Sequence, residues 1–169
     1  MPANRSYVVF GGTFDPIHEG HISAIRNLLQ QFDTVIVAPT ERNPWKELPM
    51  TSLSKRVAMI ELVLNAESLP FTFVSNELQP GLILSSITYV YAEELVQKFR
   101  HTFQGNLHWA IGEDQQESVE RWRNWQTLQV PIVSVPIEID IHSTAVRQGE
   151  SLPHPAIRNF IDAEQLYRK

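Results

Sequence analysis

The protein has 169 residues, of which 43% are hydrophobic and 20% are charged, an ordinary composition for one globular domain spanning residues 1–169. Its net charge of -5 argues against a general nucleic-acid binder, because affinity for a phosphate backbone comes from Lys and Arg side chains. The absence of cysteine excludes disulfides, thiol nucleophiles and thiolate metal sites.

Short apolar stretches and helical periodicities alternate along the chain. The first residues lead directly into an apolar strand at 7–10 without the longer apolar core of a signal peptide. No run elsewhere is long enough to cross a membrane, so we expect a cytoplasmic protein without membrane partners. Apolar residues between 22 and 29 then recur at helical spacing. Further strands are predicted at 35–38, 71–74, 107–111, 132–135 and 137–141, helices at about 54–65, 86–100 and 155–167, and a proline-containing loop at 39–51.

This alternation of strands and helices predicts an α/β fold, with a parallel sheet and helices on both faces. In such sheets, ligands bind beyond the carboxyl ends of the strands, near a switch in strand order. Three predicted strand ends carry polar or glycine-rich sequences, at residues 11–21, 112–114 and 142–147.

The first of these strand ends opens a helix and carries two histidines. Gly11 and Gly12 allow a close approach of the backbone to a ligand, and the free amides of the following helix start attract anions. His18 and His21 are three residues apart, so both rings can face one ligand. The string matches neither a Walker A loop nor the dinucleotide-binding glycine pattern. A turn with two surface histidines and a capping Asp15 is the simpler interpretation, and the pattern alone leaves it open.

The last strand end also runs into a helix. Ser143 and Thr144 supply hydroxyl groups and amides at its start, and Arg147 lies on the same helix face. Such groups together form a polyphosphate site. The alternative is an ordinary N-cap beside a solvated arginine, and it stays open on these residues alone.

Longer matches indicate a family. Residues 11–21 closely resemble the signature GGTFDPxHxGH of the HxGH nucleotidyltransferases, and residues 141–147 resemble their second signature, ISSTxxR, with His142 where many relatives have serine. Residues 111–114 match the pattern IGxD, and Trp122 matches a tryptophan that follows a short helix later. The chain is therefore similar to the nicotinate/nicotinamide mononucleotide adenylyltransferases, and the resemblance implies their Rossmann-like nucleotidyltransferase fold.

The resemblance implies a role for each matched residue. Catalysis falls to His18, His21 and Arg147, and their contacts to phosphate are expected to raise the pKa values of the histidines. Trp122 would stack on the pyridine ring, and Thr88 would lie near its carboxyl substituent. The implied ATP-binding residues are Gly12, Thr13, Phe14, His18, His21, Gly112, Asp114, Ser143, Thr144 and Arg147. The implied mononucleotide-binding residues are Lys46, Arg56, Thr88 and Trp122.

The implied reaction is attack by the 5′-phosphate of nicotinate mononucleotide on the α-phosphorus of ATP, which gives deamido-NAD and pyrophosphate in NAD biosynthesis. No general base is needed, because the phosphate is ionised at neutral pH. Catalysis is then expected to come from positioning of the reactants and from stabilisation of charge on the transferring phosphoryl group. Mg²⁺ is expected to arrive with ATP, and no protein metal site is expected. The expected partners are ATP and a pyridine mononucleotide.

Two departures from the family leave alternatives open. The segment between Trp122 and Ile141 is shorter than in typical bacterial relatives and lacks their Arg-Arg-Pro-Gly-like sequence, and Ile87 replaces a tyrosine. The acceptor therefore stays open among nicotinate mononucleotide, nicotinamide mononucleotide and other phosphates such as phosphopantetheine. A non-catalytic nucleotide-binding module is a further alternative. The sequence does not fix the oligomeric state, and a homo-oligomer stays open.

Overall fold

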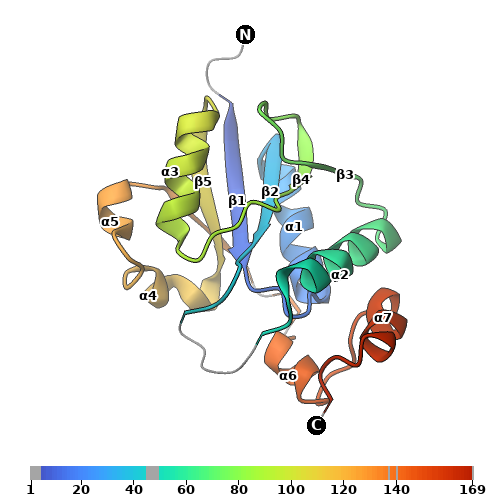
Figure 1. The fold of residues 1–169 in the computed structure, drawn as a ribbon. Coiled ribbons are helices and arrows are strands. Elements are labelled where there is room, and N and C mark those ends of the chain that lie inside the picture. Colours follow the sequence, from blue (N-terminus) through green and yellow to red (C-terminus); the bar gives the residue numbers. More distant parts are fainter. Residues whose placement is uncertain (1–4, 45–49, 137, 140, 169) are drawn as a thin grey trace.

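A six-stranded sheet forms the centre of the computed structural model, which describes residues 5–44, 50–136, 138, 139 and 141–168. Its order is β3-β4-β2-β1-β5-β6, and each neighbouring pair is parallel. The expected parallel α/β fold is thus confirmed (Figure 1). The strands are β1 (Ser6–Gly12), β2 (Thr34–Pro39), β3 (Phe71–Phe73), β4 (Gly81–Leu84), β5 (Asn106–Gly112) and β6 (Ile132–Val135).

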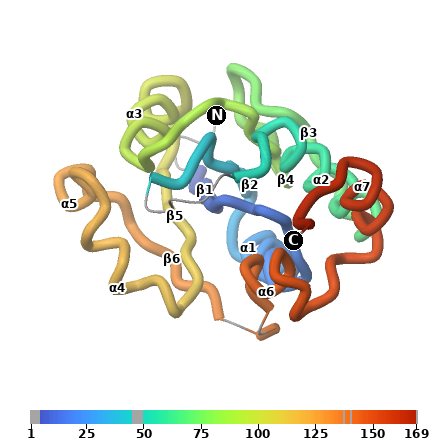
Figure 2. The backbone as a smooth tube through the Cα atoms, turned by 60° about the horizontal axis from the view of Figure 1, so that its bottom comes forward, coloured from blue at the N-terminus to red at the C-terminus, as the bar shows by residue number. Residues whose placement is uncertain are grey.

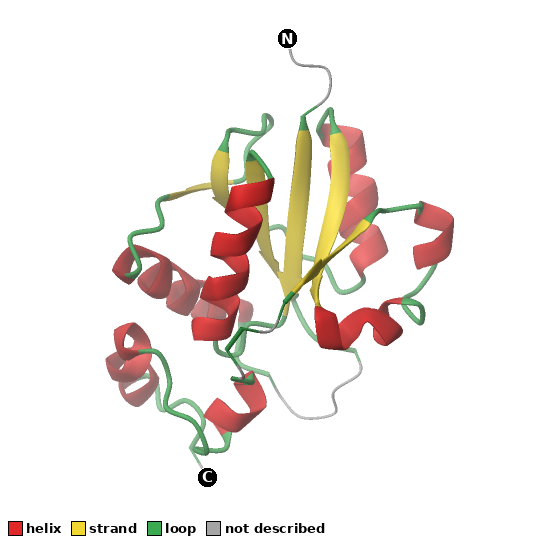
Figure 3. Ribbon diagram, turned by 180° about the vertical axis from the view of Figure 1, so that it is seen from behind, coloured by secondary structure: helices red, strands yellow, loops and turns green. Residues whose placement is uncertain are grey.

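Helices cover both faces of this sheet (Figures 1 and 3). One apolar cluster joins one face to α1, α2 and α7, and a second cluster joins the other face to α3, α4 and α5. Along β1, Val8 and Phe10 belong to the first cluster, whereas Tyr7 and Val9 belong to the second. Successive side chains of a strand point to opposite faces, so a sheet covered on both sides requires a continuous apolar run. The helices are α1 (Glu19–Gln31), α2 (Leu53–Ala66), α3 (Ala92–Thr102), α4 (Gln116–Val119), α5 (Trp125–Leu128), α6 (Ser143–Arg147) and α7 (Arg158–Ala163).

Several predicted elements differ from the structure. Strand β4 was not predicted, although it pairs with both β2 and β3. The helix predicted at 86–100 begins only at Ala92, because Tyr89 donates to the carbonyl of Ala38 at 2.5 Å and its own carbonyl accepts from the amide of Glu41. These tertiary hydrogen bonds hold the preceding segment outside the helix.

The C-terminal part of the chain is less helical than the sequence predicts. The stretch predicted at 155–167 consists of a 3₁₀ turn at Pro155–Ile157 followed by α7. Positive φ angles at Gln165 and Tyr167 end the helical path. In the predicted stretch 137–141, the described residues 138, 139 and 141 form no strand, and residues 137 and 140 lie outside the described part. In the part of the chain that is described, no helix is long and apolar enough to span a membrane.

Candidate active site at the carboxyl ends of the strands

A cavity of about 820 Å³ lies where β1, β5 and β6 end. Strand β1 sits between β2 and β5, so the chain leaves it toward one side of the sheet and later returns to its other side. This is the switch in strand order at which parallel α/β sheets bind ligands. Figure 2 is turned to bring this end of the sheet forward, with α4 on one side and α6 on the other.

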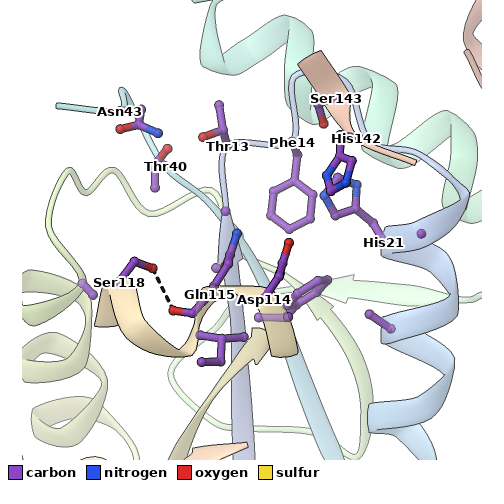
Figure 4. Close-up of a pocket in the computed structure, with 18 of the residues that line it drawn as sticks. Thr13, Phe14, His21, Thr40, Asn43, Asp114, Gln115, Ser118, His142 and Ser143 are labelled. Carbon is purple, nitrogen blue, oxygen red and sulfur yellow. Dashed lines mark hydrogen bonds between the residues drawn. The ribbon is translucent and has the colours of Figure 1, made fainter. Parts of the chain in front are cut away.

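All ten residues that were expected to bind ATP line this cavity. They come from four segments: the end of β1, the start of α1, the turn after β5, and α6. Figure 4 shows Phe14, His21, His142, Ser143 and Asp114 around the same space. The structure therefore brings together segments that lie about 130 residues apart in the sequence, from the end of β1 at Gly12 to α6, which begins at Ser143.

The two histidines of the first signature are held by the backbone of the helix that they open. His18 is the N-cap of α1, and its Nδ1 accepts a hydrogen bond from the amide of Gly20 at 3.1 Å. The Nδ1 atom of His21 accepts from the amide of His18, also at 3.1 Å. This is a capping box in which imidazoles replace the usual hydroxyl and carboxylate. The two rings stack with their centroids 3.7 Å apart.

These hydrogen bonds fix the chemical form of both histidines. Because each Nδ1 accepts from an amide, each neutral ring carries its proton on Nε2 and is a donor there. Burial lowers the pKa of His18 to about 4, and the neighbouring His142 acts in the same direction. Burial, assisted by His18, lowers the pKa of His21 well below its ordinary value. In the protein without nucleotide, the pKa values of both histidines are therefore lowered. The rise that we expect from contacts with phosphate applies to the complex with ATP and stays a prediction.

The neutral histidines should make the protein less stable as the pH falls from about 7 to about 5. Each binds a proton in the unfolded chain with a pKa near 6.5, whereas His18 in the folded protein resists protonation until about pH 4. The unfolded state then binds more protons, so the free energy of unfolding should fall by about 2 kcal/mol per histidine over this range. Hydrogen bonds lower the pKa values of Glu67 and Glu93 in the folded protein, which places these carboxylates below the range from pH 7 to pH 5.

Denaturant titrations at the two pH values measure this loss. His18→Asn is the matched variant, because asparagine keeps an N-cap acceptor but does not titrate. It should remove about half of the pH dependence. An unchanged dependence in this variant would contradict the assignment of His18 as a neutral, buried imidazole.

The second signature is fastened directly to the first. Ser143 Oγ donates to the carbonyl of Pro16 at 2.9 Å. Arg147 Nη1 donates to the carbonyl of Asp15 at 2.8 Å, and its Nη2 donates to Thr144 Oγ1 at 3.1 Å. The guanidinium is therefore oriented by two acceptors, one of which belongs to Thr144 on the cavity wall. A fixed guanidinium close to two imidazole donors is suited to binding a polyphosphate.

A tight contact between backbone and aromatic side chains explains Gly11 at the end of β1. A Cβ atom at this position would lie 2.4 Å from Trp109 Cζ2 and 2.9 Å from the hydroxyl oxygen of Tyr89. Both distances are far below normal van der Waals contact. Gly11 thus lets the indole and phenol rings form the floor of the cavity beside the first signature.

An aromatic cluster holds Trp122 at the far side of the cavity. Its ring meets Trp109 and Trp125 edge to face, with centroid distances of 5.9 Å and 5.1 Å. Trp109 and Trp125 are buried, whereas Trp122 is partly exposed and lines the cavity. Trp122 is thus a partly exposed aromatic side chain on the cavity wall, and its stacking on a pyridine ring stays a prediction.

Several lining residues near Trp122 were missed from the sequence. Arg121, Arg123 and Tyr91 line the same side of the cavity. Arg123 lies 4.4 Å from the centroid of the Tyr91 ring and is paired with the carboxylate of Glu93. Tyr91 falls within the helix predicted at 86–100, whereas the two arginines lie in a segment with no predicted element, and only their proximity to Trp122 in the sequence could have indicated them.

Of the other residues expected to bind the mononucleotide, Arg56 requires a correction. Its side chain is fully buried, and it donates to the carbonyls of Thr51, Thr13, Thr40 and Glu41 at 2.7–2.8 Å. A guanidinium used in this way holds together the loops after β1 and β2 and does not reach a substrate.

Thr88 and Lys46 are the other two residues that were expected to bind the mononucleotide. Thr88 is exposed and does not line the cavity, whereas the adjacent Tyr89 and Val90 do. The tertiary hydrogen bonds of Tyr89 set this arrangement by turning its ring toward β1 and β2. Lys46 lies outside the described residues.

Known proteins resemble this chain in sequence and fold. A family model described as cytidylyltransferase-like matches residues 9–149. A Yersinia pestis protein named "Probable nicotinate-nucleotide adenylyltransferase" is 33% identical over an alignment that covers 98% of this chain and 73% of the relative. A protein of the same name from Neisseria meningitidis serogroup A is 33% identical, with 85% and 67% covered. The solved structure of Plasmodium falciparum nicotinic acid mononucleotide adenylyltransferase complexed with NaAD shares the fold, with a TM-score of 0.72 at 14% identity over 97% of this chain and 98% of that one.

Proposed function

Since the chain belongs to the cytidylyltransferase-like family, and within it to the nicotinate-nucleotide adenylyltransferases, we propose that it transfers AMP from ATP to nicotinate mononucleotide, with release of pyrophosphate. The observation that carries the proposal is the meeting of both signatures in one cavity, where the Nε2–H groups of His18 and His21 and the guanidinium of Arg147 can face one polyphosphate. The product on this reading is deamido-NAD, and the protein is an enzyme of NAD biosynthesis.

The geometry supports catalysis by positioning. The attacking phosphate of the mononucleotide is already ionised near neutral pH, so the reaction requires no general base. His18 and His21 offer neutral donors whose direction is fixed by backbone amides before any nucleotide arrives. Preorganised donors of this kind stabilise the charge that develops on the transferring phosphoryl group. Arg147 would stabilise the pyrophosphate as it leaves.

We propose that Mg²⁺ accompanies ATP, with the phosphates supplying most of its ligands. Asp114 lines the cavity, and it lies in the 3₁₀ turn after β5. Among the described residues, no group of three or more His, Cys, Asp or Glu side chains is placed to hold a metal ion. When bound, the ion would neutralise part of the phosphate charge, and the residues of this chain would orient the nucleotide around it.

Pyrophosphate release tests the proposed function. Purified protein is assayed with ATP and Mg²⁺ in the presence of nicotinate mononucleotide, nicotinamide mononucleotide or phosphopantetheine. We expect turnover to be fastest with nicotinate mononucleotide. Turnover with phosphopantetheine but with neither pyridine mononucleotide would overturn the acceptor while leaving the nucleotidyl transfer intact. No pyrophosphate with any acceptor would favour a non-catalytic nucleotide-binding module.

Replacement of Trp122 by alanine should weaken both pyridine mononucleotides similarly, by about 1–3 kcal/mol, because stacking does not distinguish an acid from an amide. ATP binding should change little, because the phosphate-facing residues lie on other segments. The KM values for the three substrates measure this. Trp122→Phe is the matched control, since it keeps an aromatic ring against Trp109 and Trp125 and should retain most of the affinity. A loss confined to ATP would exclude the stacking role.

A further inference from the structure

Asp15, within the first signature, is a buried carboxylate that receives hydrogen bonds from two distant parts of the chain. It is 3% exposed. Its Oδ2 atom accepts from the amide of Thr51 at 3.1 Å, and its Oδ1 atom accepts from the hydroxyl of Tyr167 at 2.5 Å. Tyr167 lies 152 residues after Asp15, so the C-terminal segment is bonded directly to the turn that carries the two histidines.

The C-terminal segment packs against α2, and this packing brings Tyr167 close to Asp15. Ile157 and Ile161 are buried in the apolar cluster that includes α2, and Leu166 and Tyr167 pack against the same cluster. At the start of the segment, His154 Nε2 and Glu67 Oε1 are 2.6 Å apart, which ties it to the end of α2. In Figure 2 the red C-terminal end lies next to the blue segment that follows β1.

The hydroxyl of Tyr167 is a permanent donor. Burial, together with its hydrogen bond to Asp15, raises the pKa of this phenol well above its ordinary value. It therefore keeps its proton at every pH at which the protein would work. The phenol thus donates to one oxygen of the Asp15 carboxyl group, while the other oxygen accepts from the amide of Thr51.

Asp15 also positions the arginine of the second signature. Its backbone carbonyl accepts from Arg147 Nη1 at 2.8 Å, while its side chain is held by Tyr167 and Thr51. A shift of Asp15 would consequently move the acceptor that orients the guanidinium. Tyr167 itself does not line the cavity, whereas Arg147 does.

We propose that Tyr167 is a positioning residue of the active site, which acts through Asp15 to set the orientation of Arg147 toward the pyrophosphate part of ATP. The inference rests on the proposed function for the identity of the substrate. It assigns to the C-terminal segment a specific part in nucleotide binding in addition to its packing against α2.

The test is Tyr167→Phe, which removes one hydroxyl and keeps the ring in the apolar cluster. The dissociation constant of pyrophosphate, measured by titration calorimetry, and the KM for ATP should each rise about tenfold, as expected for loss of a hydrogen bond to a charged group. The KM for nicotinate mononucleotide should not change. The matched control is Tyr7→Phe, because the buried hydroxyl of Tyr7 has no hydrogen-bond partner among the described residues. This control should leave all three constants as in the wild type.

A double variant separates positioning from general stability. In an Arg147→Ala background there is no guanidinium to orient, so Tyr167→Phe should weaken pyrophosphate binding no further. A further tenfold loss in that background would overturn the inference, as would wild-type pyrophosphate binding by Tyr167→Phe alone. A purely structural role would lower thermal stability and kcat and leave every KM unchanged. If the wild type binds pyrophosphate but forms none from ATP and nicotinate mononucleotide, the proposed function fails and the comparison of variants still decides the role of Tyr167.

Discussion

Replacement of His21 by alanine should lower kcat by about 10²–10³-fold, the effect of losing one donor to a charge that develops in the transition state. His21 presents its Nε2–H group in a fixed direction, because its Nδ1 atom is occupied by the amide of His18. The KM for ATP should rise much less than kcat falls, since the hydrogen bond would strengthen mainly as the phosphoryl group transfers. Single-turnover measurements with saturating ATP isolate this step.

Two further variants at this position distinguish the donor from the helix cap. His21→Asn puts an amide oxygen close to the position of Nδ1, so it should keep the capping hydrogen bond and the stability but remain as slow as the alanine variant. His21→Gln puts an amide N–H close to the position of Nε2 and should recover part of the rate. If His21→Asn is fast, the contribution of His21 is structural, and the donor must be sought elsewhere.

Replacement of Arg56 by methionine should lower the free energy of unfolding by about 3–5 kcal/mol, because it leaves partly buried carbonyl oxygens without the guanidinium donor that now satisfies them. Four carbonyls lose their donor in this variant. Asp15, whose negative charge partly offsets the effect of burial on the pKa of Arg56, also loses a nearby cation. Arg56→Lys should be almost as unstable, since one ammonium group cannot reproduce the fork of the guanidinium.

Denaturant titration measures this loss, with Lys55→Met as the matched control on the same helix. Lys55 is partly exposed and pairs with Glu164 on the surface, so its replacement should change stability by less than about 1 kcal/mol. A stable Arg56→Met protein with a raised KM for nicotinate mononucleotide alone would instead restore Arg56 as a direct substrate ligand.

Arg56 shows what the sequence could and could not reveal about the site. The residue shares a helix face with Met59, Ile60 and Val63, and that spacing indicates that it points into the core. Family resemblance placed it near the substrate instead, because a sequence match gives a position and not the direction of a side chain. The carbonyl groups that accept hydrogen bonds from Arg56 lie in loops that are distant in sequence, and no local sequence pattern predicts that these loops meet.

The first signature was predictable because its constraints are local. Within eleven residues it contains a strand end, a turn, an N-cap and the first turn of a helix, and each has its own residue preferences. The wall around Trp122 was less predictable. Arg121, Arg123 and Tyr91 reach the cavity only through the packing of α3 against α5 and through the aromatic cluster, which depend on tertiary contacts. Strand β4 was missed for a related reason: its four residues become a strand by pairing between β2 and β3.

Hydrogen bonds between the first signature and the C-terminal part of the chain also affect how the protein folds. Ser143, Arg147 and Tyr167 bond to Asp15 and Pro16 across separations of 127, 132 and 152 residues. Closing such long loops lowers the entropy of the chain, and this loss is offset only when the final contacts form. Contacts between residues so far apart in sequence therefore slow folding. The sheet and α1 can assemble before these bonds exist, but the turn at Asp15 gains its last supports only when the C-terminal segment has docked. Synthesis from the N-terminus delivers the histidines before Arg147 and Tyr167, so the nascent chain contains both imidazoles before the contacts that complete the nucleotide site can form.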